Sequence, residues 1–263
     1  AGVAVGAATQ DLRPVAEIQF MGFVYPTIDQ IVNHAGRLRT RTRGRLTCPM
    51  VLRAPYGGGI HAPEHHSESV EAMLTHVPGI RVVIPSTPTK AYGLLLAAIQ
   101  NPDPVVFLEP KRLYRTGKEQ VEDNGEALPL DKAFTVREGN DLTLIAWGAM
   151  MKETLAAATQ LAEEGIEAEV LDLATLKPLD QATIMASVEK TGRAVIVHEA
   201  ALTGGYGGEI AARIAEHGLL SLIAPVRRVT GYDTVIPLPK LEHHYLPSVD
   251  RILTAAREVM AYT

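Results

Sequence analysis

The feature that most constrains the fold is a repeated alternation of short β-branched runs with longer segments of helical periodicity. In the first half of the chain this pattern predicts strands over residues 50–53, 81–84 and 104–108, and helices over 28–38, 69–76 and 90–100. Pro85 marks the end of the second of these strands. Strands that alternate with helices in this way form βαβ units, so we expect a parallel sheet.

The alternation stops over residues 116–135 and then resumes. This stretch scatters glycine, proline and charged residues and has few large apolar ones, as is typical of an interdomain linker. Beyond it, strands are predicted over 142–147, 169–173, 194–197 and 226–229, and helices over 150–164, 180–189, 207–217 and 248–260. We therefore predict a first α/β domain over 1–115, a linker over 116–135 and a second α/β domain over 136–263.

Composition excludes several classes of function. The net charge of -5 gives no general reason to bind nucleic acid or an anionic membrane. The single cysteine, Cys48, forbids an intrachain disulfide and favours a reducing, cytoplasmic location. No apolar run approaches the roughly 20 residues that span a bilayer. The amino-terminal stretch also lacks the basic segment of a signal peptide.

A glycine-opened loop at residues 57–69 is the first candidate for chemistry, because it contains His61, His65 and His66. Histidine titrates near neutral pH, so this loop is a candidate proton-transfer site, although a solvated surface loop would have the same composition. The chain has no P-loop, and glycines 204–208 lack the spacing of a dinucleotide-binding loop. Any phosphorylated cofactor is therefore expected to depend on a partner chain.

Six sequence runs occur in one order along the chain: RPVAEIQF at 13–20, RAPYGGG at 53–59, HSES at 66–69, VIPSTP at 83–88, LEPKRLYR at 108–115 and GYDT at 231–234. Together they resemble the β subunit of the E1 component of 2-oxo acid dehydrogenase complexes, over essentially the whole chain. The resemblance implies a transketolase-like architecture, in which a pyrimidine-binding domain is followed by a transketolase C-terminal-like domain.

The resemblance also implies a cofactor and partners. Thiamine diphosphate would be shared with an E1 α subunit, which holds Mg²⁺ and the diphosphate, in an α2β2 heterotetramer. The reaction would be the oxidative decarboxylation of a small 2-oxo acid, with transfer of the acyl group to a lipoyl group of the E2 acyltransferase. E2 would contribute lipoyl and subunit-binding domains. The protein would be cytoplasmic if bacterial and in the mitochondrial matrix if eukaryotic.

Residue by residue, the resemblance assigns His66 as the catalytic histidine that assists reductive acylation of the lipoyl group. Gln19 and Phe23 fall where the family contacts the aminopyrimidine ring. His61, His65 and His76 match no catalytic position, and we interpret them as surface or structural residues. The family also binds a structural K⁺ through carbonyls near the end of a helix, and the matching positions here are Cys48, Met50, Val51, Ala98, Asn101 and Asp103.

The family's catalytic glutamate lies just before the Gly/Ala-rich helix with which this sequence opens, so we expect an N-terminal segment to be missing. Pyruvate is the favoured substrate, and a branched-chain 2-oxo acid such as 2-oxoisovalerate is the alternative. Two other classes stay open. The chain could be a non-catalytic assembly module, or a metallohydrolase, although its histidines fit no His-x-x-x-His pattern.

Overall fold

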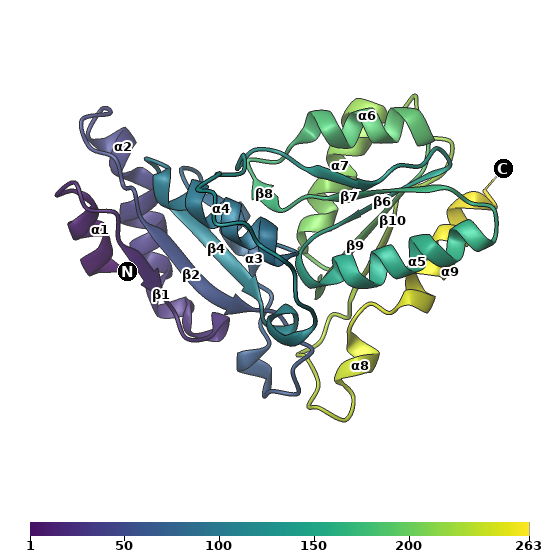
Figure 1. Ribbon diagram of the computed structural model, residues 1–263, viewed down its shortest axis with the longest axis horizontal. Helices are drawn as coiled ribbons and strands as arrows, with labels where there is room; N and C mark the ends of the chain where they lie inside the picture. Colours follow the sequence, from purple (N-terminus) through teal and green to yellow (C-terminus); the bar gives the residue numbers. More distant parts are fainter. Residues whose placement is uncertain (263) are drawn as a thin grey trace. The chain divides into compact units, whose positions relative to one another are not determined.

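The computed structural model describes residues 1–262, and this chain divides into two compact units. The first unit comprises Ala1–Asp131 together with Thr175–Pro178, and the second comprises Lys132–Ala174 together with the chain from Leu179 onward. Each unit is built around its own five-stranded sheet (Figure 1). No helix among residues 1–262 combines the length and the apolar character needed to cross a bilayer.

The first sheet has the strand order β1-β2-β4-β3-β8. Its pairs β1–β2, β2–β4 and β4–β3 are parallel, which confirms the predicted parallel sheet. At the other edge β8 runs antiparallel to β3, with Val82 opposite Lys177. The strands are β1 (Val15–Glu17), β2 (Val51–Tyr56), β3 (Arg81–Val83), β4 (Val105–Pro110) and β8 (Thr175–Lys177).

The α-helices of the first unit are α1 (Gly2–Ala8), α2 (Leu38–Arg41), α3 (Glu71–Thr75) and α4 (Pro88–Gln100). Helix α4 starts where the sequence has standard start signals. Pro88 is its first residue, and the Thr87 hydroxyl accepts a hydrogen bond from the amide of Lys90 at 3.2 Å. Helix α4 packs on β4, and α3 packs on β3.

The predicted helix over residues 28–38 is wrong as a regular α-helix. The chain instead forms a series of short turns: η2 (Tyr25–Thr27), the π-helical turn η3 (Gln30–His34) and η4 (Ala35–Arg37). The segment also makes a close backbone contact. A Cβ on Gly36 would lie 2.8 Å from the Pro78 carbonyl oxygen, so glycine lets the two backbones approach at this position.

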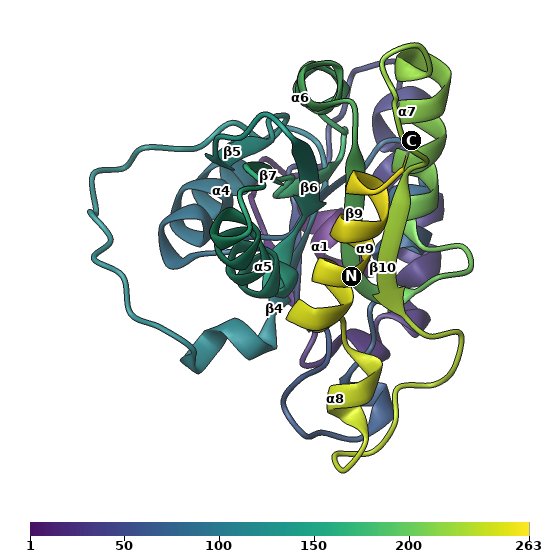
Figure 2. The same ribbon diagram turned by 90° about the vertical axis from the view of Figure 1, so that its right-hand side faces the viewer.

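The second sheet has the strand order β10-β9-β6-β7-β5, parallel except for the β5–β7 pair. Helices α5 and α9 pack against each other, as do α6 and α7 (Figure 2). The elements of this unit are β5 (Phe134–Arg137), β6 (Leu142–Ala146), η7 (Gly148–Met150), α5 (Met151–Glu163), β7 (Ala168–Asp172), α6 (Gln181–Thr191), β9 (Ala194–Ala201), α7 (Tyr206–Gly218), β10 (Arg227–Gly231), α8 (Glu242–Tyr245) and α9 (Val249–Met260).

Three strands, β1, β5 and β8, were missed by the sequence pattern. Strand β1 is a three-residue edge strand with no buried residue. Strand β5 occupies part of the stretch interpreted as linker, and β8 follows β7 within the second half of the chain. Both β5 and β8 are short edge strands in antiparallel pairs. Strand β5 has no buried residue and β8 has only three residues, so neither shows the long apolar run of a central parallel strand. Strands β4, β6 and β7 are buried along their whole length and were readily predicted.

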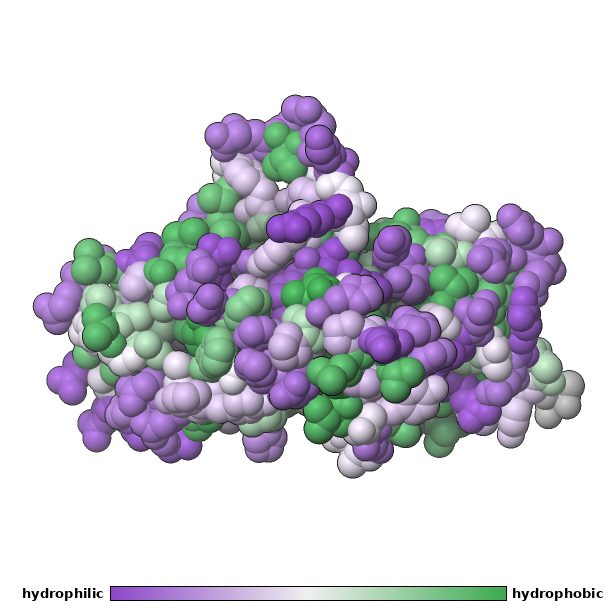
Figure 3. All heavy atoms as spheres, turned by 90° about the horizontal axis from the view of Figure 1, so that it is seen from below, coloured by the Kyte–Doolittle hydropathy of each residue, from purple (hydrophilic) through white to green (hydrophobic). Residues whose placement is uncertain are grey.

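The segment before β5 is held against the first unit. The Glu119 carboxylate accepts a hydrogen bond from the Thr89 amide at 3.0 Å, and the Tyr92 hydroxyl donates to Asp123 at 2.6 Å. Both Thr89 and Tyr92 belong to α4. On the face drawn in Figure 3, hydrophilic and hydrophobic residues are mixed in small patches rather than gathered in one apolar area.

Candidate active site

The carboxyl ends of β1, β2 and β4 meet at one edge of the first sheet, where ligands of open α/β sheets bind. Arg53 of β2 links the three strands. Its guanidinium donates two hydrogen bonds to Glu109 of β4, at 2.6 and 2.9 Å, and lies 3.2 Å from Glu17 of β1. The Tyr114 hydroxyl donates to the same Glu109 carboxylate at 2.5 Å. This edge is therefore fixed by charge-assisted hydrogen bonds across adjacent strands.

The histidine loop leaves this edge directly after β2. Gly57 and Gly59 have φ values of 82° and 84°, a left-handed conformation that glycine adopts without strain. The loop is closed at its base by a hydrogen bond from the Gly57 amide to the Glu68 carbonyl at 2.9 Å. Within it, the turn η5 (Glu64–His66) carries a bond from the His66 amide to Pro63 at 3.0 Å. A glycine-rich start and a closed base thus hold His66 at the sheet edge.

Four aromatic or imidazole rings gather where this loop meets the chain after β1. The His66 ring stacks on Phe20 with centroids 4.1 Å apart and an interplanar angle of 26°. The ring centroid of His65 lies 4.1 Å from that of His66, and the ring centroid of Phe23 lies 6.0 Å from that of His66. We call Phe20, Phe23, His65 and His66 the ring cluster.

A glycine makes this cluster possible. Gly22 lies in η1 (Met21–Phe23), and a Cβ placed on it would be 2.0 Å from the carbonyl oxygen of His65. No side chain fits in that space, so the backbones of η1 and η5 are in direct contact. This contact brings Phe20 and Phe23 beside the two histidines.

The electrostatic surroundings favour the uncharged form of His66. Partial burial, then the neighbouring His65 and Lys111, lower the pKa of His66, and Glu64 opposes them. Lys111 is buried, and its ammonium lies 5.3 Å from the centroid of the Phe20 ring. Nearby, burial and the Glu68 carboxylate raise the pKa of Tyr25 to about 12.

The predicted residues of this region occupy different environments. Phe23 is 46% exposed and belongs to the ring cluster, whereas Gln19 is exposed on the stretch between β1 and Phe20. His61 and His76 are exposed, in keeping with their interpretation as surface residues. His65 is exposed too, but its contact with His66 was missed.

The six positions assigned to K⁺ lie at the opposite, amino edge of the first sheet. Asn101 caps the carboxyl end of α4, and its amide bonds the Ala98 carbonyl at 3.3 Å. The Met50 carbonyl accepts from the Val105 amide at 3.0 Å. The guanidinium of Arg13 donates to the carbonyls of Ile99 and Asn101, at 2.7 and 3.3 Å, so carbonyls of this helix end already face a cation.

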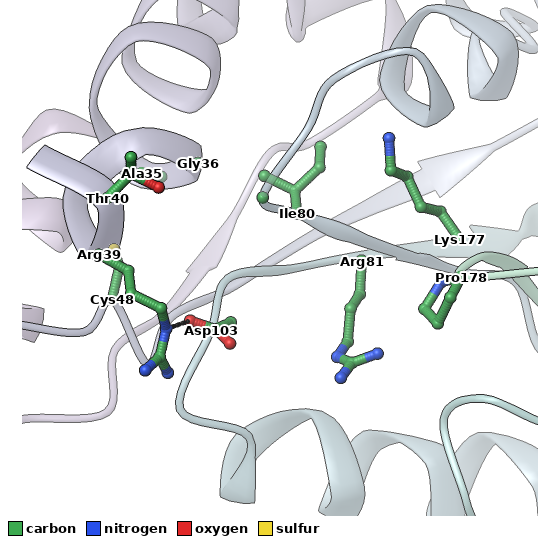
Figure 4. Close-up of a pocket in the computed structure, with 11 residues that line it drawn as sticks. Ala35, Gly36, Arg39, Thr40, Cys48, Ile80, Arg81, Asp103, Lys177 and Pro178 are labelled. Carbon is green, nitrogen blue, oxygen red and sulfur yellow. Dashed lines mark hydrogen bonds and ion pairs between the residues drawn. The ribbon is translucent and has the colours of Figure 1, made fainter. Parts of the chain in front are cut away.

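Two of these six residues, Cys48 and Asp103, line a pocket of about 290 Å³ (Figure 4). The Asp103 carboxylate accepts a hydrogen bond from Arg39 at 2.7 Å, and Arg81 and Lys177 also line the pocket. Burial raises the pKa of the Cys48 thiol to about 11, which keeps it protonated at neutral pH. The side chain of Asp103 is therefore engaged by an arginine.

Both units match known protein domains. Residues 1–117 match the family model of the transketolase pyrimidine-binding domain, and residues 131–252 match that of the transketolase C-terminal domain. The chain is 48% identical to the pyruvate dehydrogenase E1 component subunit beta of Bacillus subtilis (strain 168), over 99% of this chain and 80% of that protein. It is 46% identical to the protein of that name from Acholeplasma laidlawii, over 98% of this chain and 79% of the relative.

The chain belongs to the pyruvate dehydrogenase E1 β-subunit family. A solved structure described as "Split gene transketolase, inactive beta4 tetramer" superposes with a TM-score of 0.81 over 99% of this chain and 80% of that one, at 24% sequence identity. At that identity the likeness concerns the fold alone, and it confirms the expected transketolase-like architecture.

The ring cluster and the carbonyls at the amino edge all lie within the part of the chain matched by the pyrimidine-binding model. Within residues 1–262, no three His, Cys, Asp or Glu side chains come together in a way that could hold a metal ion. The histidine loop therefore has neighbours suited to ring stacking rather than a set of metal ligands. The metallohydrolase alternative gains no support from this arrangement.

Proposed function

We infer that this chain is the β subunit of a thiamine-diphosphate-dependent pyruvate dehydrogenase E1 component. The observation that carries this inference is the stack of His66 on Phe20 at the carboxyl edge of the first sheet, in a chain whose relatives are named as that subunit. The overall reaction converts a 2-oxo acid and an oxidised lipoyl group into CO₂ and an S-acyl dihydrolipoyl group.

The residues at the edge suit one end of the cofactor. Phe23 presents a half-exposed ring against which a flat aminopyrimidine could stack, and Gln19 presents an exposed amide nearby in sequence. When bound, thiamine diphosphate supplies the electron sink for decarboxylation. The part left to Gln19 and Phe23 is to bind and orient the pyrimidine ring.

His66 is proposed as the group that passes a proton to the lipoyl sulfur during acyl transfer. Its imidazole is half-buried and kept in place by Phe20 on one side and His65 nearby. A lowered pKa leaves the ring uncharged at rest, so His66 must first take up a proton from water. The imidazolium that forms is a stronger acid than that of an ordinary histidine, which favours donation of this proton to the sulfur. The stack fixes the ring without using either nitrogen.

The partners follow from the same assignment. An E1 α subunit would hold the diphosphate and Mg²⁺ in an α2β2 heterotetramer, and an E2 acyltransferase would deliver the lipoyl group. The bacterial origin of the named relatives and the single cysteine, Cys48, support a cytoplasmic location.

We also propose that K⁺ binds at the amino edge, largely through backbone carbonyls, at the positions Cys48, Met50, Val51, Ala98, Asn101 and Asp103. Carbonyls at the end of a helix attract cations, and Arg13 already takes up part of this role. The test is thermal unfolding in matched KCl and choline chloride. A melting temperature that is specifically higher in KCl supports the site, and equal temperatures contradict it.

The proposed reaction is tested by co-expressing the protein with an E1 α subunit. The complex is then assayed with thiamine diphosphate and Mg²⁺ on pyruvate and on 2-oxoisovalerate. Faster turnover of pyruvate is expected. Preferential turnover of 2-oxoisovalerate would favour the branched-chain alternative, and turnover of neither would defeat the proposal.

The assembly-module alternative is tested by His66→Gln in the same complex. The expected result is loss of acyl transfer to a lipoyl domain, while assembly with the α subunit is retained. His76→Gln is the matched control, because His76 is exposed and lies outside the ring cluster. Full acyl transfer by the His66 variant would favour the assembly module.

A further inference from the structure

Lys111 is a buried charged residue at the candidate site to which sequence reasoning assigned no role. It is the first residue of η6 (Lys111–Arg115), directly after β4, and only 5% of it is exposed. Lysine is almost never buried to this extent unless its charge has a partner. The Phe20 ring is one such partner, with the ammonium 5.3 Å from its centroid, a distance at which a cation and an aromatic face attract each other.

The backbone places this ammonium beside the histidine loop. Pro110, the residue before Lys111, pairs with Tyr56 at the end of β2, and the loop that carries His66 begins at the next residue. Lys111 and His66 therefore leave adjacent strands at the same edge of the sheet. Their side chains then contact the same ring, that of Phe20.

The charged groups around His66 come from two elements. Glu64 and His65 belong to η5 itself, and Lys111 belongs to η6. The rings that reach His66 from the segment after β1 are those of Phe20 and Phe23, which carry no charge. Lys111 supplies a positive charge that lowers the pKa of His66, and its burial weakens screening by water and salt.

We propose that Lys111 is a positioning residue for His66: its buried ammonium, held against Phe20, keeps the imidazole uncharged at rest and makes a proton taken up by His66 easier to pass on. The lowered pKa of His66, to which Lys111 contributes, agrees with this role. The part that concerns proton transfer rests on the proposed function. The part that concerns the charge of His66 does not.

The experiment measures the titration of His66 directly in the complex with the α subunit. Diethyl pyrocarbonate modifies the uncharged imidazole, and peptide mass spectrometry gives the rate at each histidine as a function of pH. His243, an exposed histidine of the second unit, is the internal control. The variants are Lys111→Met, which removes the charge, Lys111→Arg, which keeps it, and Lys118→Met, which removes an exposed charge.

Lys111→Met is expected to move the His66 midpoint to higher pH. Lys111→Arg and Lys118→Met are expected to leave it near the wild-type value, and His243 is expected to be unaffected throughout. An unchanged His66 midpoint in folded Lys111→Met would overturn the proposal, and so would an equal shift in Lys118→Met.

Burial of Lys111 makes misfolding of the methionine variant a specific risk, so Lys111→Gln provides a second neutral variant with a polar end. If both neutral variants fail to fold while Lys111→Arg folds, the charge serves the fold, and the proposal is overturned. The titration does not depend on turnover. A shifted midpoint in a complex inactive on pyruvate would therefore refute the proposed function and not the role of Lys111.

Discussion

Gly22→Ala is the substitution that most directly tests how the ring cluster is built. The added Cβ would lie 2.0 Å from the His65 carbonyl oxygen and 2.9 Å from the carbonyl carbon, whereas ordinary contact begins at 3.4 Å. Both obstructing atoms belong to the backbone, so no side-chain rotation relieves the overlap. Gly22 is not among the residues with positive φ, so the alanine has no backbone strain of its own.

The size of the effect follows from that overlap. To restore ordinary contact, η1 and η5 must separate by 1.4 Å, the difference between 3.4 and 2.0 Å. Overpacking of this kind destabilises a protein by about 1–3 kcal/mol. A misplacement of about 1 Å at a reacting group lowers a rate by about a hundredfold. Because the movement separates His66 from Phe20, acyl transfer is expected to fall by at least that factor.

The assay is a single turnover in the assembled E1 complex. Pyruvate is mixed with a lipoyl domain, and the acylated domain is counted by mass spectrometry, while thermal unfolding reports stability. Gly117→Ala is the matched control, because no heavy atom lies within 4 Å of its added Cβ. If Gly22→Ala kept both the melting temperature and the acyl-transfer rate of the control, the backbone contact would not be what positions His66.

Two further substitutions test the electrostatics. His198 is buried against Trp147, and burial lowers its pKa to about 4. Below pH 6.5 the unfolded chain binds a proton at His198, whereas the folded chain binds none until the pH approaches 4. The free energy of unfolding therefore has its full value above pH 6.5 and falls by on the order of 3 kcal/mol as the pH is lowered toward 4. Urea unfolding followed by Trp147 fluorescence should show this loss in the wild type and a flatter profile in His198→Gln; equal slopes would contradict it. Glu109→Gln removes the bidentate pair with the half-buried Arg53 and should destabilise the first unit by roughly 2 kcal/mol. Thermal unfolding measures this change, and Glu122→Gln, at an exposed position, is the control. If Glu109→Gln lowered the melting temperature no more than the control does, the Arg53–Glu109 pair would not stabilise the sheet edge.

Much of the fold could be predicted because its central strands are buried on both faces. Strands β4, β6 and β7 are buried along their whole length and are mostly apolar in sequence. The helix predicted over 90–100 lies within α4, which begins two residues earlier, after the Thr87 cap. Three of the four edge strands, β1, β5 and β8, lack that apolar signal and were missed, whereas the edge strand β10 was predicted. The irregular geometry of the helical segment around Gly36 was also missed, as was its backbone contact with residues 78–79, which are distant in the sequence.

The candidate site was predictable only in part. A glycine-opened loop with three histidines is visible in the sequence, and the family resemblance singles out His66 among them. The stack on Phe20 and the burial of Lys111 depend on the approach of η1, η5 and η6, which come from three separate stretches of the chain. One feature of the sequence indicates this approach. Gly22 lies between Phe20 and Phe23, and a glycine at that position allows another backbone segment to come close.

The exposure of the ring cluster bears on why such a chain should need a partner. Phe23 is 46% exposed, and it lies beside His66, whose ring is stacked on Phe20. Ligand sites in proteins enclose most of the surface of the ligand, so a ring resting on Phe23 alone would remain open to water. A second wall from another chain would exclude that water, and exclusion of water strengthens each electrostatic contact at the site. An edge whose loop is closed by backbone hydrogen bonds and whose aromatic face is open therefore suits the cofactor site that we propose this chain shares with a second subunit.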